Sequence, residues 1–161
     1  MQESPYKYLN RKDLINILIG ARIDKRVDIE GITIEVTMPY LSGPQICNLS
    51  GKLGNPIQYP QDGGGLSRWQ YFANLLNFCI QNKKEELLLQ ELFKLENFNN
   101  VLQNCNTKNI KSAYETVVAC ILEHVNKELY FCGYQLRKAG SNVYICILDA
   151  PLAIESKKIK N

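Results

Sequence analysis

The chain has 161 residues, of which 45% are hydrophobic and 22% are charged, as is typical of a globular protein. Its length predicts a single domain, which we place at residues 1–155, with a polar tail over 156–161 that fits the start of a linker to a further domain. The net charge of +3 is too small to indicate a nucleic-acid or membrane partner by itself. The sequence contains neither a signal-peptide pattern nor an apolar run of about 18 residues, which predicts a cytoplasmic protein without a membrane partner.

The cysteines and the histidine give no indication of a metal site. The six cysteines lie more than ten positions apart, which excludes a CxxC-type metal or redox motif. Several lie in apolar runs, such as Cys79, and predict reduced, buried thiols, with scattered disulfides as the alternative. His124 is the single histidine and cannot form a usual zinc site alone. We therefore expect no metal and no cofactor.

The N-terminal part predicts one short helix and one strand. Residues 14–19 fit a helix, although their β-branched side chains leave a strand open. Residues 24–26 fit a charged turn. The stretch 29–38 contains a strict alternation of apolar and polar residues from Ile32 to Met38, which predicts a half-buried strand that ends at Pro39. The apolar positions of that strand are Ile32, Ile34, Val36 and Met38.

The central part predicts two capped helices joined by a glycine-rich loop. Ser42 is a good N-cap for a helix that stops at Gly54. Ser67 caps the next helix, which runs to Gln81 and is apolar around most of its circumference. Such a helix is expected to be central and mostly buried.

The C-terminal part predicts further helices and then a hairpin. The helices are expected over 83–94, 96–104 and 107–127. Strands are expected over 129–136 and 143–148, joined by a turn at 139–142, with an added edge strand at 152–155. The predicted fold class is therefore α+β, a predominantly helical core with a small antiparallel sheet or hairpin at the C-terminal end.

The glycine-rich loop is one candidate site. Gly63, Gly64 and Gly65 lead into the helix start at Ser67 and Arg68. Backbone N–H groups, a hydroxyl and a guanidinium at a helix N-terminus can hold a phosphate or another anion. The alternative is a flexible turn and an N-cap, with Arg68 paired to a nearby aspartate. Neither GxxxxGK[ST] nor GxGxxG is present to support a nucleotide site.

A second candidate is an interaction surface made by Tyr59 and the polar stripe Gln70, Asn74 and Asn77. Trp69 is better explained as core, because it falls at helical spacing with other apolar residues. The expected partner is another protein or a C-terminal effector domain of the same protein, with self-association as an alternative.

Two stretches carry a resemblance to a known family. They are Leu41-Ser42-Gly43-Pro44-Gln45-Ile46-Cys47 and Ser67-Arg68-Trp69-Gln70-Tyr71, with the glycine-rich loop between them. Over residues 39–93 the chain resembles the N-terminal module of bacterial abortive infection family proteins, with weaker similarity after residue 129. The resemblance implies a role in anti-phage defence, ahead of a helical effector region, and it implies no catalytic residue.

The functional prediction is a non-catalytic sensor or interaction module of an abortive-infection protein. The alternative is a winged-helix-like nucleic-acid-binding domain, built on helices 43–53 and 67–81 and the C-terminal hairpin. Their linker of roughly a dozen residues is long for a motif that needs about 3–4, so nucleic acid is the less favoured partner. The sequence does not decide whether this chain is an enzyme, although the missing catalytic motifs favour a protein that is not one.

Overall fold

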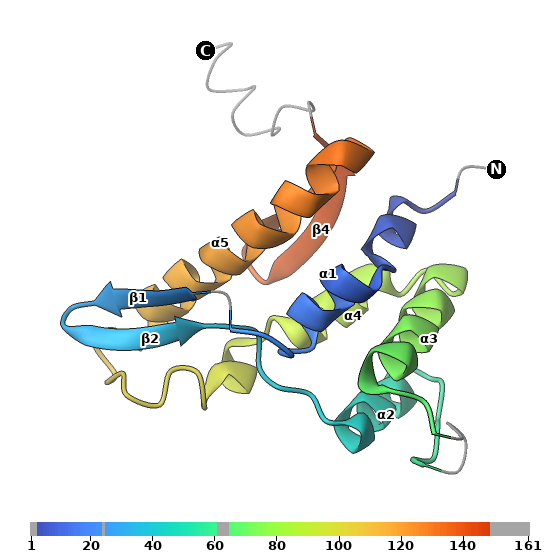
Figure 1. Ribbon diagram of the computed structural model, residues 1–161, viewed down its shortest axis with the longest axis horizontal. Helices are drawn as coiled ribbons and strands as arrows, with labels where there is room; N and C mark the ends of the chain where they lie inside the picture. Colours follow the sequence, from blue (N-terminus) through green and yellow to red (C-terminus); the bar gives the residue numbers. More distant parts are fainter. Residues whose placement is uncertain (1–2, 24, 61–64, 149–161) are drawn as a thin grey trace.

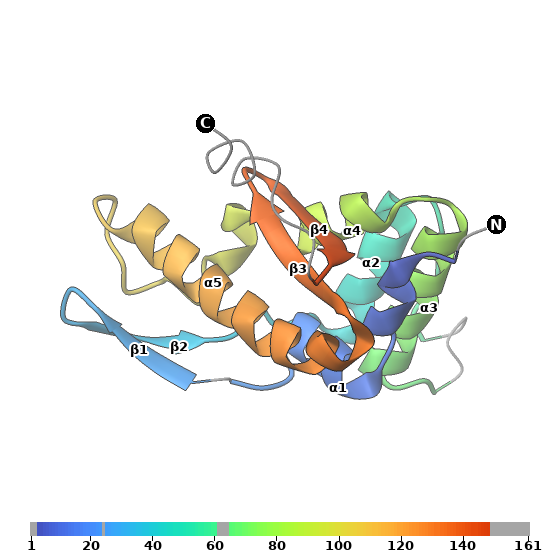
Figure 2. The ribbon, with the colours of Figure 1, turned by 90° about the horizontal axis from the view of Figure 1, so that it is seen from above.

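The computed structural model describes residues 3–23, 25–60 and 65–148 and has an α+β fold (Figure 1). A helical body carries two separate two-stranded antiparallel sheets, the second of them near the C-terminal end. The helix α5 (Ile110–Leu129) contacts strands of both sheets and crosses the molecule between them (Figure 2). The predicted fold class is therefore confirmed.

The N-terminal segment folds as the 3-10 helix η1 (Pro5–Leu9) and the helix α1 (Lys12–Leu18). The structure thus decides for a helix where the sequence left a strand open. Leu14, Ile15 and Leu18 are fully buried, because their spacing places them on one face of the helix. Burial of this face outweighs the strand preference of the β-branched residues.

The next segment is a hairpin of β1 (Lys25–Ile29) and β2 (Ile32–Val36), where the sequence predicted one strand and a charged turn. The turn is Glu30-Gly31, with both residues at positive φ, 51° and 83°, as a two-residue hairpin turn of this type requires. The first strand was missed because three of its five residues, Lys25, Arg26 and Asp28, are charged, which favoured the interpretation as a turn. The predicted buried face is confirmed, since Ile34, Val36 and Met38 are buried.

The central helices are α2 (Gly43–Lys52), α3 (Arg68–Gln81) and α4 (Glu85–Leu92). The predicted cap of α2 is confirmed: the Gln45 N–H donates to Ser42 Oγ (3.2 Å), and the Ser42 N–H donates to Gln45 Oε1 (2.8 Å). The helix α3 was expected to be mostly buried, but only one side of it is buried, with five of its 14 residues: Tyr71, Phe72, Leu75, Leu76 and Cys79.

The C-terminal part contains η2 (Leu95–Phe98), α5, η3 (Tyr130–Cys132), β3 (Tyr134–Ala139) and β4 (Asn142–Ile147). The predicted helix over 96–104 is only the short η2 followed by turns. The predicted strand at 129 begins at Tyr134 instead, because α5 and η3 continue to Gly133, whose φ of 82° ends the helical backbone. The predicted turn at 139–142 is confirmed, and the predicted edge strand at 152–155 lies outside the described residues.

Buried side chains from η1 to β4 form one continuous hydrophobic cluster. None of the six cysteines, which all lie in the described residues, is in a disulfide; Cys47 and Cys79 are buried, whereas the other four are half-buried. Burial raises the pKa of the Cys79 thiol to about 11, so it remains a protonated, unreactive core group. In the described part of the chain, none of the helices combines the length and the apolar character needed to span a bilayer.

Candidate functional site

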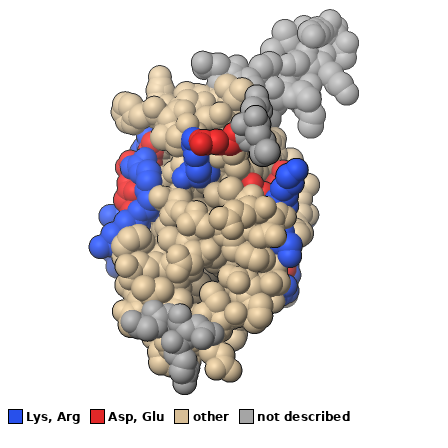
Figure 3. All heavy atoms as spheres, turned by 90° about the vertical axis from the view of Figure 1, so that its right-hand side faces the viewer, with Lys and Arg blue, Asp and Glu red and all other residues tan. Residues whose placement is uncertain are grey.

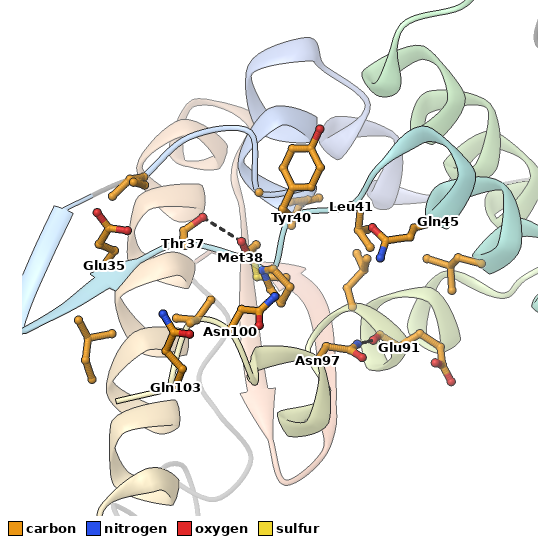
Figure 4. Close-up of a pocket in the computed structure, with 18 of the residues that line it drawn as sticks. Glu35, Thr37, Met38, Tyr40, Leu41, Gln45, Glu91, Asn97, Asn100 and Gln103 are labelled. Atoms are coloured by element: carbon orange, nitrogen blue, oxygen red, sulfur yellow. Dashed lines mark hydrogen bonds between the residues drawn. The ribbon is translucent and has the colours of Figure 1, made fainter. Parts of the chain in front are cut away.

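A groove of about 810 Å³ lies between β2 and three other segments of the described chain (Figure 4). Its walls are β2, the segment 37–41 that leaves the strand, the helix α2, and the segment 97–104 that follows α4. These segments are distant in sequence, so the groove exists only in the folded chain. Its size falls within the range of pockets that bind ligands.

Carboxamide side chains dominate the polar lining of the groove. They are Gln45, Asn48, Asn97, Asn100, Gln103 and Asn104. Each carboxamide offers two N–H donors and one carbonyl acceptor, and its charge does not change with pH. In Figure 4, Asn100 and Gln103 lie below β2, across the groove from Thr37 and Met38. Such a lining is suited to binding a polar ligand, such as a peptide backbone, rather than to moving protons.

Charged side chains in the groove are paired with one another. Arg26 Nη2 lies 3.0 Å from Glu35 Oε2, and Lys52 Nζ lies 2.8 Å from Glu91 Oε2. Glu91 also pairs with Lys94 at 2.8 Å. Burial alone raises the pKa of Glu91, but the hydrogen bonds from Lys52 and Lys94 outweigh it and leave that pKa below its usual value. Glu91 is therefore held ionised near neutral pH, which makes it a poor general acid.

The floor of the groove is apolar. Leu18, Ile34, Met38 and Leu92 line it and are almost completely buried. Leu49 and Val101 line it as partly buried residues at the edge of the core. The groove thus combines a hydrophobic base with hydrogen-bonding walls, the usual composition of a site that binds part of a macromolecule or a drug-sized ligand.

The sequence-predicted anion site is only partly described. Gly63 and Gly64 lie outside the described residues, and Gly65 is exposed with φ 85°. The Ser67 N–H donates to Gln70 Oε1 (2.8 Å), which satisfies one of the donors that an anion would use. Anion binding at this loop stays a prediction.

The guanidinium of Arg68 points to the protein body. Its Nε donates to the Leu41 carbonyl (2.7 Å) and its Nη2 to the Ile19 carbonyl (2.9 Å). Its Cζ lies 4.0 Å from the ring centroid of Tyr40. Since Tyr40 and Leu41 line the groove, Arg68 holds one wall of the groove in place without lining it.

The predicted interaction surface is brought together only in part. Tyr59 is 45% exposed, and its ring packs against Tyr71 with centroids 5.3 Å apart. Asn74 is exposed, and Asn77 accepts a hydrogen bond from Asn10 Nδ2 (2.9 Å). Gln70 caps α3. Figure 3 shows the face that carries α2 and α3: its middle is free of charged side chains, which lie along the two sides and in the upper part. Partner binding by this face stays a prediction.

The groove itself was missed from the sequence. The usable signal is the density of carboxamides after α4, where seven of thirteen residues from 97 to 109 are Asn or Gln. They are Asn97, Asn99, Asn100, Gln103, Asn104, Asn106 and Asn109. Two of them shape the backbone: Asn106 Oδ1 accepts from the Asn109 N–H (3.2 Å), and Asn109 Oδ1 accepts from the Asn106 N–H (2.9 Å). Four of the seven line the groove: Asn97, Asn100, Gln103 and Asn104.

A smaller cavity of about 280 Å³ lies beside α5, lined by His124, Arg22 and Thr37 among others. In the described residues, no group of three or more His, Cys, Asp or Glu side chains is arranged to hold a metal ion.

No family model, no curated protein and no solved structure matches this chain.

Proposed function

We propose that this chain is a recognition module that binds a partner in the groove between β2, α2 and the segment 97–104. The observation that supports the proposal most directly is the lining, in which carboxamides and mutually paired charges surround an apolar floor. These groups bind and orient a ligand, and the groove carboxylate Glu91 is held ionised. We therefore propose binding without catalysis.

We further propose that the module acts in the cytoplasm as the sensor of an abortive-infection protein in anti-phage defence. The resemblance that suggests this role rests on residues 41–47 and 67–71. In the fold these two stretches meet, because Arg68 donates to the Leu41 carbonyl. Leu41 and Gln45 of the first stretch also line the groove. Among the residues that carry the resemblance, Leu41 and Gln45 thus line the proposed binding site, and Arg68 holds its wall in place.

Filling the groove tests this proposal. In Asn100→Trp a large ring replaces a carboxamide in the lining, whereas Asn99→Trp changes the neighbouring exposed residue, which is outside the lining. Cells that express the natural gene would be challenged with a phage panel and scored by efficiency of plating. We expect Asn100→Trp to lose protection, because partner binding weakens at least about tenfold, and Asn99→Trp to retain it.

Equal stability of the two variants would be checked by urea unfolding, so that loss of protection reports on the groove. The proposal fails if Asn100→Trp protects as well as the wild type. It also fails if the purified chain hydrolyses nucleotides or cuts nucleic acid, since the module would then be an enzyme.

A further inference from the structure

One edge of β2 has unused backbone hydrogen-bonding groups. In an antiparallel pair closed by a two-residue turn, the residues that flank the turn bond to each other, and bonded and non-bonded pairs alternate from there. The register therefore gives the bonded pairs Ile29 with Ile32, Val27 with Ile34, and Lys25 with Val36. Thr33 and Glu35 lie between these pairs, so their N–H and C=O groups point away from β1, to the free edge of β2.

The second hairpin, β3–β4, also has backbone groups that point away from the strand pair, and some of them are hydrogen-bonded to side chains. By the same alternation, the backbone groups of Leu136 and Ile145 point outward from β3 and β4. The Leu136 N–H donates to Asn126 Oδ1 (2.7 Å), and the Leu136 carbonyl accepts from Asn126 Nδ2 (3.0 Å). The Ile145 N–H donates to the Tyr6 hydroxyl (3.2 Å). Both edge groups of Leu136 and the N–H of Ile145 are thus bonded to side chains from α5 and η1.

The corresponding groups of β2 are open. Among the described residues, neither Thr33 nor Glu35 has a backbone hydrogen bond to a partner outside the hairpin. Both residues line the groove, as does Ile34 between them. Because successive strand residues face opposite sides of a sheet, a groove that touches all three runs along the strand edge. An exposed edge of this kind is a template for an added strand.

The opposite wall complements an added strand. Asn100, Gln103 and Asn104 present donors and acceptors that suit the outer edge of a peptide backbone. Arg26 and Lys52 balance Glu35 and Glu91, so the lining carries no net charge. A backbone without net side-chain charge matches such a lining better than a phosphate or a polyanion does.

We propose that an extended segment of a partner protein, without net charge, adds to β2 as a third strand and fills the groove. This inference rests on the proposed function and specifies its ligand as a polypeptide backbone. The sheet edge supplies hydrogen bonds at Thr33 and Glu35, while the apolar floor receives alternate side chains of the peptide. The walls formed by α2 and 97–104 favour a single strand over the broad edge of a second sheet.

Proline substitution can test the free edges of β2 and β1 independently. Thr33→Pro removes the outward N–H of β2 without removing a bond between the strands, because Thr33 is in a non-bonded pair. Asp28→Pro is the matched control, since Asp28 is the cross-strand partner of Thr33 and its N–H points to the free edge of β1. Both variants keep the groove lining other than residue 33.

The probe is a displayed library of random nine-residue peptides, selected on the full chain. We expect enriched peptides whose affinity, measured by fluorescence anisotropy, falls at least about tenfold in Thr33→Pro and stays within about twofold in Asp28→Pro. The amides of Thr33 and Glu35, and not those of Arg26 and Asp28, should gain protection from hydrogen exchange when peptide is bound.

Several results would overturn strand addition. Strand addition is contradicted if the selection enriches no peptide, or if the enriched peptides bind Thr33→Pro and the wild type equally. It is also contradicted if Asp28→Pro loses as much affinity as Thr33→Pro. If Asn100→Trp abolishes binding or protection while Thr33→Pro does not, the groove keeps its proposed function and only the strand addition falls.

Discussion

Arg68 connects three segments that are distant in sequence. It starts α3, and its guanidinium binds the carbonyl at the end of α1 and the Leu41 carbonyl while it stacks on Tyr40. Hydrogen bonds from a charged donor contribute about 1.5–3 kcal/mol each. We expect Arg68→Ala to lower the free energy of unfolding by about 2–4 kcal/mol in urea titrations followed by circular dichroism.

Lys111→Ala is the matched control, because it removes a cation from an exposed position on α5 and should change stability by less than about 0.5 kcal/mol. The same Arg68→Ala variant decides between the two roles of this arginine. If it keeps wild-type stability but loses a thermal shift that phosphate or nucleotides give the wild type, the residue binds anions and does not hold the groove wall.

Asn126 joins two elements, since its one carboxamide satisfies both backbone groups of Leu136 at the edge of β3. Asn126→Ala would leave a donor and an acceptor unpaired beside a residue that is 1% exposed. We expect a loss of about 2–3 kcal/mol in the free energy of unfolding, measured in urea. Lys127→Ala, on the exposed side of the same helix, should be near neutral, and equal losses for both would contradict the edge-closing role.

The helices α2 and α3 also bear on the nucleic-acid alternative. The chain between them runs from Leu53 to Ser67, far longer than the connection of about 3–4 residues in a helix-turn-helix. The face they share has no charge at its centre (Figure 3). Since phosphate contacts need Lys or Arg, this face offers little to a duplex. A steep fall of DNA or RNA affinity with salt would be the signature of that alternative.

Elements with local signals were predictable from the sequence. Ser42 with Gln45 and Ser67 with Gln70 have the spacing of a helix start, and both helices begin there. The β1–β2 hairpin was not predicted, because β1 contains the charged residues Lys25, Arg26 and Asp28, and its first residues were interpreted as a turn. The groove depends on contacts between β2, α2 and 97–104, and periodicity carries no information on such contacts.

At the scale of the whole molecule, the two ends of the described chain meet. Tyr6 of η1 is buried, and its hydroxyl accepts the hydrogen bond of the Ile145 N–H in β4. The same continuous core contains both residues, together with α1, α3 and α5. The 3-10 helix η1 is therefore part of the packing that holds the C-terminal hairpin. A substitution of Tyr6 should lower the free energy of unfolding of the whole domain.

Burial of Tyr6 makes the free energy of unfolding depend on pH in the alkaline range. Burial raises the pKa of Tyr6 from its ordinary value of 10.0 to about 12, although the Ile145 hydrogen bond offsets part of the effect. Between these two values the unfolded chain releases the phenol proton and the folded chain keeps it. Stability is thus full below pH 10 and falls as the pH rises towards about 12, by about 2–3 kcal/mol from this group.

Tyr6→Phe isolates this contribution from the lysines and other tyrosines that titrate in the same range. Near neutral pH the variant should be less stable than the wild type by about 1–3 kcal/mol, because the Ile145 N–H loses its acceptor. As the pH approaches about 11, the gap should shrink, since only the wild type has the Tyr6 proton to lose. Urea midpoints measured across this range, with the exposed Tyr130→Phe as control, check it; a gap that stays constant with pH would contradict the linkage.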